Sequence, residues 1–259
     1  MDFKTITLTR ENKTAVLTLN RPEAMNALNE QMIEEMGWAV EQIAEDLEVR
    51  VLIITGGEKV FAAGGDIKAM MDCDPLAARD YVAPIHMVFN RIAGLPKPTI
   101  AAVCGHALGG GAELMATCDF RIAGEKAQFG FPEITLGIFP AAGGSQRIPR
   151  LIGLARAKEL MFTGDIIGAS TAQDIGLVNK VVPTERVMEE ALKLAGKLAS
   201  RAPLALSYLK KSMHSGLDID LGSGLAQELD KFTLLFATID QKEGMKAFIE
   251  KRKPIFLGK

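Results

Sequence analysis

Residues 100–114, which read IAAVCGHALGGGAEL, decide the fold of this chain. An apolar run of strand length ends at Gly105, and a helix follows three consecutive glycines at positions 109–111. A helix start leaves backbone N–H groups unpaired and carries partial positive charge. Because glycine has no Cβ, a ligand oxygen can approach these donors closely. The stretch therefore predicts a strand-to-helix turn with an anion-binding N–H, and Glu113 is a candidate catalytic carboxylate in its first helical turn.

The same glycine turn is also consistent with a purely structural role. Three glycines allow a helix to pack tightly on a strand, and a glutamate near a helix N-terminus is favoured by the helix dipole. Taken alone, these residues fit both interpretations. Two further stretches bear on the choice between them.

The first is FAAGGDIK at residues 61–68, where small side chains let the backbone come close to a ligand. A plain turn with Asp66 as a helix N-cap explains the same composition. The second surrounds Glu133, whose apolar neighbours in the sequence are Phe131, Ile134, Leu136, Ile138 and Phe139. Desolvation among apolar side chains would raise the pKa of Glu133 toward neutrality and suit it to proton transfer, unless those neighbours point elsewhere.

The rest of the pattern is that of an α/β protein. Two β-rich runs separated by a turn predict a hairpin, and short apolar runs predict strands buried on both faces. Apolar residues at helical spacing predict a helix capped by Asn26 or Asn29. The expected strands cover 5–9, 14–19, 51–55, 99–103 and 118–123, and the expected helices run from Met32 to Ile43 and over 81–92.

A shift in composition near residue 185 predicts two regions. Residues 1–185 form an α/β core, and helices dominate residues 186–259. Apolar stripes run from Val187 to Leu198 and from Leu225 to Phe236. The helical region is expected to pack either on its own core or on another subunit.

Composition excludes several classes of protein. A formal net charge of -2 over 259 residues gives no electrostatic reason to expect a nucleic-acid partner. The three cysteines, Cys73, Cys104 and Cys118, lack the spacing of a zinc site or a disulfide framework. No apolar run approaches the ~20 residues that span a bilayer, and the first residues lack a secretory signal. We therefore expect a cytoplasmic protein with no metal and no membrane partner.

Several motifs occur in a fixed order along the whole chain. They are VLTLNRP at 16–22, FAAGGDIK at 61–68, ALGGGAEL at 107–114, FGFPE at 129–133, GGSQR at 143–147, EGMKAF at 243–248 and EKRK at 250–253. By these motifs the chain resembles the enoyl-CoA hydratase/isomerase (crotonase) family. The resemblance implies a spiral of ββα units that forms two roughly perpendicular sheets, followed by a C-terminal helical region. It also implies a homotrimer, or a homohexamer made of two trimers.

The resemblance further implies a site for an acyl-CoA thioester. The backbone N–H groups of Gly65 and Gly110 would hold the thioester oxygen, Glu113 would hold and help activate a water, and Glu133 would exchange a proton at C2. No cofactor is implied beyond the coenzyme A that the substrate carries. The positions that match the family's coenzyme A contacts, in some members contributed by a neighbouring subunit near the C-terminus, are Ala62, Ala63, Asp66, Ile67, Lys68, Phe232 and Lys251.

Because it has both Glu113 and Glu133, the chain resembles the members of the family that hydrate 2-enoyl-CoA in fatty-acid β-oxidation or related acyl-CoA degradation. Gly65 stands where many members have alanine, and Phe131 where the residue is often polar. Double-bond isomerisation and hydration of a cyclic dienoyl-CoA are the alternatives within the family. A binding or assembly subunit without activity is the alternative outside catalysis, and the retained glutamates argue against it.

Overall fold

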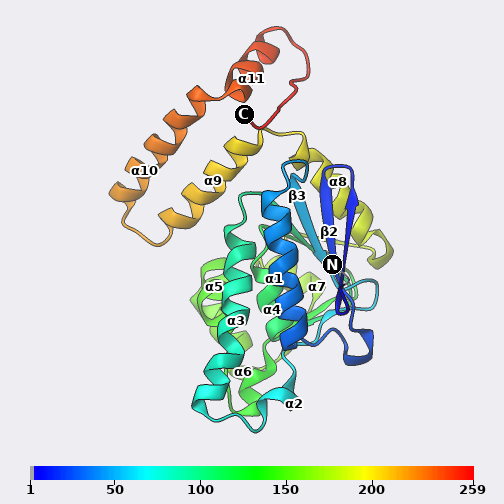
Figure 1. Ribbon diagram of the computed structural model, residues 1–259. Coiled ribbons are helices and arrows are strands. Elements are labelled where there is room, and N and C mark those ends of the chain that lie inside the picture. The colour runs from blue at the N-terminus through cyan, green and yellow to red at the C-terminus, as the bar shows by residue number, and fades with distance from the viewer. Residues whose placement is uncertain (1–2) are drawn as a thin grey trace.

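The computed structural model describes residues 3–259, which contain two sheets (Figure 1). The larger sheet has the order β1-β2-β3-β5-β7-β10, and the smaller has the order β4-β6-β8-β9. The strands are β1 Ile6–Glu11, β2 Thr14–Leu19, β3 Val51–Thr55, β4 Val60–Ala62, β5 Thr99–Val103, β6 His106–Leu108, β7 Phe120–Gly124, β8 Gln128–Gly130, β9 Ile166–Gly168 and β10 Lys180–Val182.

From β3 to β8 the chain alternates between the sheets, with odd strands in the larger and even strands in the smaller. Helices separate the successive strand pairs. Parallel pairing joins β3 to β5 and β5 to β7 in one sheet, and β4 to β6 and β6 to β8 in the other. This is the expected spiral of ββα units, and it carries the β6–α4 glycine turn along the smaller sheet.

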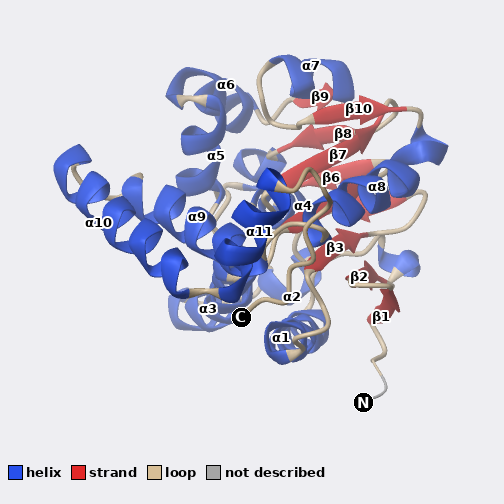
Figure 2. Cartoon of the chain, turned by 90° about the horizontal axis from the view of Figure 1, so that it is seen from above, coloured by secondary structure: helices blue, strands red, loops and turns tan. Residues whose placement is uncertain are grey.

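The helices surround these sheets (Figure 2). They are α1 Glu30–Glu45, α2 Ile67–Met70, α3 Pro75–Gly94, α4 Gly110–Ala116, α5 Gly144–Ile152, α6 Leu154–Thr163, α7 Ala169–Asp174, α8 Val187–Ala199, α9 Pro203–Gly216, α10 Leu221–Leu234 and α11 Ile239–Ile249. Short 3₁₀ helices lie at η1 Pro22–Ala24, η2 Pro132–Leu136, η3 Thr184–Arg186 and η4 Leu235–Ala237. No helix within residues 3–259 combines the length and the apolarity needed to cross a bilayer.

Side chains of β3 alternate between two apolar cores, as a strand buried on both faces requires. Leu52 and Ile54 belong to the main core, whereas Val51 and Ile53 belong to a second core that includes Val187 of α8. The helix α8 therefore packs on the larger sheet, although composition groups it with the C-terminal region. The division of the chain near residue 185 stays a prediction.

The remaining C-terminal helices, α9 to α11, project from the sheets (Figure 1). The predicted stripe on α10 and η4 is exposed, with Leu229 and Phe232 each more than half accessible. Phe232 instead packs edge-on against Phe236, with ring centroids 5.4 Å apart. Within one chain this stripe therefore does not cover the core.

The helix expected over 81–92 begins earlier, at Pro75. Asp74 caps it, accepting hydrogen bonds from the amides of Leu76 and Ala77, and proline is well suited to the first helical position. The Asp-Pro pair is a helix start signal that the expected range omitted.

The N-cap of α1 is Asn29, whose side chain accepts a hydrogen bond from the amide of Met32 at 3.0 Å. The other candidate, Asn26, donates to backbone carbonyls instead.

Candidate active site

The two glycine-rich turns lie against each other. Gly65, just before α2, bridges to Leu28, and a Cβ built on Gly110 would lie 3.5 Å from the amide nitrogen of Gly65. Within residues 3–259 neither of these two amides donates to an acceptor outside its own element. Gly110 is the first residue of α4, where an amide has no intrahelical partner. Two adjacent N–H groups are thus free for one oxygen.

The three glycines of the turn have different roles. Gly109 has φ 49° and ψ -122°, a conformation that favours glycine. A Cβ on Gly111 would lie only 2.2 Å from the carbonyl oxygen of Ala62, so this glycine permits α4 to pack on β4. Gly110 supplies the free amide. The structural interpretation of the turn therefore holds at Gly109 and Gly111, whereas anion binding by the amide of Gly110 stays a prediction.

The segment that carries Gly65 is fastened on both sides. The amide of Ala63 donates to Met25 at 3.0 Å, and the amide of Asp66 donates to Leu28 at 3.1 Å. The Tyr81 hydroxyl accepts from the Asp66 amide at 3.1 Å and donates to the Leu28 carbonyl at 2.9 Å. These bonds hold the Gly65 amide in place.

Asp66 does not act as an N-cap, because its side chain makes no capping hydrogen bond to α2. Its carboxylate instead pairs with Arg21 at 3.1 Å, and both side chains are about one-fifth exposed. The guanidinium of Arg21 also donates to the carbonyl of Ala27 at 3.0 Å. The salt bridge thus ties the Gly65 segment to the segment that follows β2.

Glu113 is buried, with 3% of its surface exposed. Its Oε1 accepts a hydrogen bond from the amide of Gly144 at 2.7 Å, at the start of α5. Desolvation raises the pKa of Glu113 to about 7, although the hydrogen bond from Gly144 opposes the change. The negative charge of Glu133 raises the pKa of Glu113 further, and the guanidinium of Arg147 lowers it.

Glu133 lies on η2, and its carboxylate reaches the glycine turn. A Cβ built on Gly109 would lie 2.5 Å from Oε1 of Glu133, so the missing side chain makes room for this carboxylate. Desolvation raises the pKa of Glu133. Its Oε2 is buried and has no hydrogen-bond partner among the described residues, which suits it to receive a ligand or water.

The predicted source of this desolvation was partly wrong. Ile134 and Leu136 are 45% and 52% exposed, so they do not form the apolar enclosure that the sequence pattern predicted. Phe131 is fully buried, as expected of a residue in a dry environment. The Glu133 carboxylate also contacts the glycine turn, a segment distant in the sequence.

Two carboxyl groups with raised pKa values thus lie at the β6–α4 glycine turn, which presents the free amide of Gly110 next to that of Gly65 on the other turn. Such an arrangement can stabilise a developing oxyanion and move protons at the neighbouring atoms. A family model described as enoyl-CoA hydratase/isomerase matches residues 9–259. This chain belongs to the enoyl-CoA hydratase/isomerase family.

Relatives in that family match over nearly the full length. A crotonyl-CoA hydratase of Syntrophomonas wolfei is 48% identical and covers 100% of both chains. A short-chain-enoyl-CoA hydratase of Clostridium acetobutylicum is 46% identical over 98% of this chain and 97% of its own. The crystal structure of an enoyl-CoA hydratase from Bacillus anthracis has a TM-score of 0.95 and 41% identity, covering 99% of this chain and 100% of that one. The family fold implied by the motifs is confirmed.

The residues matched to the family's coenzyme A contacts fall into two groups. Ala62 is buried in β4 and Ala63, Asp66, Ile67 and Lys68 lead into α2, with Ile67 and Lys68 exposed next to Gly65. Phe232 lies on α10 and Lys251 follows α11, both exposed. Figure 1 places α10 and α11 at the opposite end of the chain from α2. One chain therefore does not bring the two groups together.

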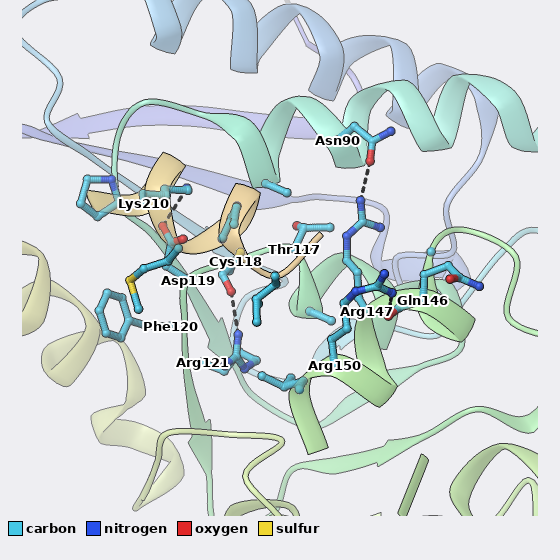
Figure 3. A pocket seen from close by; sticks show the side chains of 18 of the residues that line it. Asn90, Thr117, Cys118, Asp119, Phe120, Arg121, Gln146, Arg147, Arg150 and Lys210 are labelled. Atoms are coloured by element: carbon cyan, nitrogen blue, oxygen red, sulfur yellow. Dashed lines mark hydrogen bonds and ion pairs between the residues drawn. The ribbon is translucent and has the colours of Figure 1, made fainter. Parts of the chain in front are cut away.

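A cavity of about 790 Å³ lies elsewhere, between α3, α5 and α9 (Figure 3). It is lined by Asn90, Arg147, Arg150 and Lys210 among others, whereas Gly65, Gly110, Glu113 and Glu133 do not line it. It is therefore separate from the two glutamates and the two free amides. Arg147 connects the two regions, because it lines the cavity and also acts on Glu113.

Sequence reasoning missed the groups that support the site. Tyr81 and Arg21 were not singled out, although Arg21 lies within the VLTLNRP motif. The amide of Gly144 was not assigned a role, although Gly144 lies within the GGSQR motif. The rule that a helix N-terminus attracts a carboxylate was a usable signal for this last contact.

Proposed function

We infer that this protein is an enoyl-CoA hydratase, which adds water reversibly across the C2=C3 double bond of a 2-enoyl-CoA. The observation that carries the inference is the pair Glu113 and Glu133, both with raised pKa values, beside the free amides of Gly65 and Gly110. The hydratase relatives of 46% and 48% identity support it over the full chain.

The two amides hold the thioester oxygen and stabilise the negative charge that develops there when water attacks C3. One preorganised donor of this kind lowers a barrier by about 3–4 kcal/mol. The fastening of the Gly65 segment to Leu28 and Tyr81 keeps one donor in place before substrate arrives.

Glu113 accepts a proton from the attacking water, whose oxygen bonds to C3, and Glu133 gives a proton to C2. The charge of each carboxylate raises the cost of ionising the other, so near neutral pH the pair suits a state with one carboxylate and one carboxylic acid. The buried, unpartnered Oε2 of Glu133 supports this assignment. We propose a syn addition, in which both carboxyl groups act from the same side of the alkene.

The substrate is an acyl-CoA thioester, and crotonyl-CoA is the first one to test. Loss of the ultraviolet absorbance of the conjugated thioester measures hydration directly. No turnover of crotonyl-CoA, with turnover of a 3-enoyl or cyclic dienoyl substrate, would reassign the reaction within the family. A related 2,3-dehydroadipyl-CoA hydratase of Escherichia coli is 44% identical, so that thioester belongs in the same panel.

We also propose that the protein forms a homotrimer or a dimer of trimers. Apolar side chains exposed along α9 to α11 support assembly, because large exposed apolar patches mark interaction sites. Assembly would bring Phe232 and Lys251 of one chain to the coenzyme A site of another. Sedimentation equilibrium decides this, and a monomer at micromolar concentration would contradict it.

A cytoplasmic location and the absence of a cofactor belong to the same proposal. The cysteines Cys73, Cys104 and Cys118 are unpaired, in keeping with a reducing compartment. The thioester carbonyl itself makes C3 electrophilic, so the residues of the site suffice for the chemistry.

A further inference from the structure

Glu113 is held by a loop that comes from outside its own helix. Gly144, whose amide donates to Glu113, directly follows the loop of residues 140–143. A Cβ on Gly144 would lie 2.8 Å from both Oε1 of Glu113 and the side chain of Pro140. The fit leaves no space for a side chain. The position of this loop therefore sets the position of the carboxylate.

Arg147, one turn into α5, folds back over the loop. Its Nη1 donates to the carbonyl of Ala142 at 3.2 Å and occupies the place where a Cβ on Gly143 would lie. Its Nη2 donates to Oδ1 of Asn90 at 2.5 Å, as Figure 3 shows. One turn before Asn90 on α3, Nε2 of His86 is hydrogen bonded to the carbonyl of Ala141. The helix α3 thus holds the loop at two points.

The hydrogen-bond partners of Arg147 are uncharged, so its positive charge is not neutralised by them. The charge of Arg147 lowers the pKa of Glu113, whereas the charge of Glu133 on η2 raises it. The other charged groups near Arg147 line the separate cavity, and several are paired: Arg150 with Asp218 at 3.4 Å, and Lys210 with Asp119 at 2.8 Å. His86 and His214 line it as well, and the guanidinium of Arg121 donates to the carbonyls of Cys118 and Leu177.

We propose that Arg147 is a positioning residue for the hydration reaction, which holds the loop of residues 140–143 against α3 and thereby keeps the Glu113 carboxylate in place through the amide of Gly144. Asn90 orients the guanidinium for this task. This inference rests on the proposed function, because it assigns Glu113 the task of accepting a proton from water.

The test compares Arg147→Gln with Arg150→Gln, a matched change three residues along the same helix whose guanidinium pairs with Asp218. The pH dependence of kcat/KM for crotonyl-CoA is measured for both. Loss of a positive neighbour raises the pKa of Glu113, so the acid limb of Arg147→Gln should move up by about one pH unit, while Arg150→Gln keeps the wild-type profile.

Two further variants separate charge from geometry. Arg147→Lys keeps the charge, so its acid limb should stay near that of the wild type while kcat falls several-fold. Asn90→Ala should move the acid limb in the same direction as Arg147→Gln, but less. If Arg147→Gln fails to fold, these two variants decide the question on their own.

An unshifted acid limb in Arg147→Gln, or an equal shift in Arg150→Gln, overturns the inference. Titration of ¹³C-carboxyl-labelled glutamate by NMR, with Glu113 assigned from Glu113→Gln, reads the same pKa without turnover. A wild-type protein that hydrates no enoyl-CoA would overturn the proposed function, and the NMR titration would still decide whether Arg147 acts on Glu113.

Discussion

Replacing Gly109 by alanine tests whether the glycine turn exists to admit the carboxylate of Glu133. A Cβ at this position would lie 2.5 Å from Oε1 and 3.1 Å from Cδ of Glu133. Ordinary contacts between such atoms are about 3.5 Å, so the carboxylate has to move by about 1 Å. Because the obstructing atoms end a flexible side chain, the protein should fold with Glu133 displaced.

The expected loss divides into stability and activity. A residue other than glycine at φ 49° and ψ -122° costs roughly 1–3 kcal/mol of folding free energy. A 1 Å misplacement of a catalytic group can lower the rate about 10²-fold, which corresponds to about 2.7 kcal/mol of activation free energy. We therefore expect a folded, moderately destabilised enzyme with kcat reduced about 10²-fold.

Gly176→Ala is the matched control. Gly176 has φ +81°, and a Cβ there would meet nothing within 4 Å. Alanine there meets the strain of a positive φ without touching the site. Denaturant unfolding measures the stability of both variants, and crotonyl-CoA hydration measures kcat and KM. Wild-type kcat in Gly109→Ala, or an equal loss of kcat in Gly176→Ala, would refute the assignment of this turn.

Four more outcomes are expected. Glu113→Gln should abolish most hydration while leaving the affinity for free coenzyme A unchanged, measured by calorimetry, and equal loss of both would contradict the role given to Glu113. Because the pKa of Glu113 rises from 4.5 to about 7 on folding, the folded state binds more protons between those values, and this residue makes the protein less stable as pH rises through that window. Glu113→Gln should therefore raise the free energy of unfolding by up to about 3 kcal/mol above pH 7 and leave it unchanged below pH 4.5. Urea titrations at several pH values measure this, and a difference between variant and wild type that does not change with pH would contradict it. Tyr81→Phe removes the hydroxyl that contacts Asp66 and Leu28, so kcat should fall about 10-fold through a loosened oxyanion donor, and the carbonyl stretch of a bound thioester should shift less in Raman spectra than in the wild type. Activity should survive dialysis against a chelator, and loss that zinc or magnesium restores would disprove a reaction without metal.

Much of the fold could be predicted from local pattern. The run at 51–55 is β3 with matching bounds, because a continuous apolar segment of that length is stable only between two covered faces. The hairpin and the start of α4 at the glycine turn follow from turn chemistry within a few residues. The exposed stripe of α10 could not be placed, since an apolar stripe alone does not say what covers it.

The candidate site, like the fold, could be predicted from the sequence only in part. Glu113, Glu133 and the two amide donors were predicted from motifs, each of which is a short stretch of sequence with its own backbone geometry. The environments of these groups were not predicted. Glu133 contacts the glycine turn, which is distant in the sequence, and Asp66 forms a salt bridge rather than a helix cap.

The amino-acid sequence by itself determined the strands, the glycine turns and the family to which the chain belongs, because each strand, turn and motif depends on residues within its own segment. Only the tertiary structure decided which groups support the site. Gly144 meets Glu113 across 31 residues, Asp66 meets Arg21 across 45, and Arg147 meets Asn90 across 57. No local preference specifies such a contact, since it forms only when the spiral of sheets brings separate segments together.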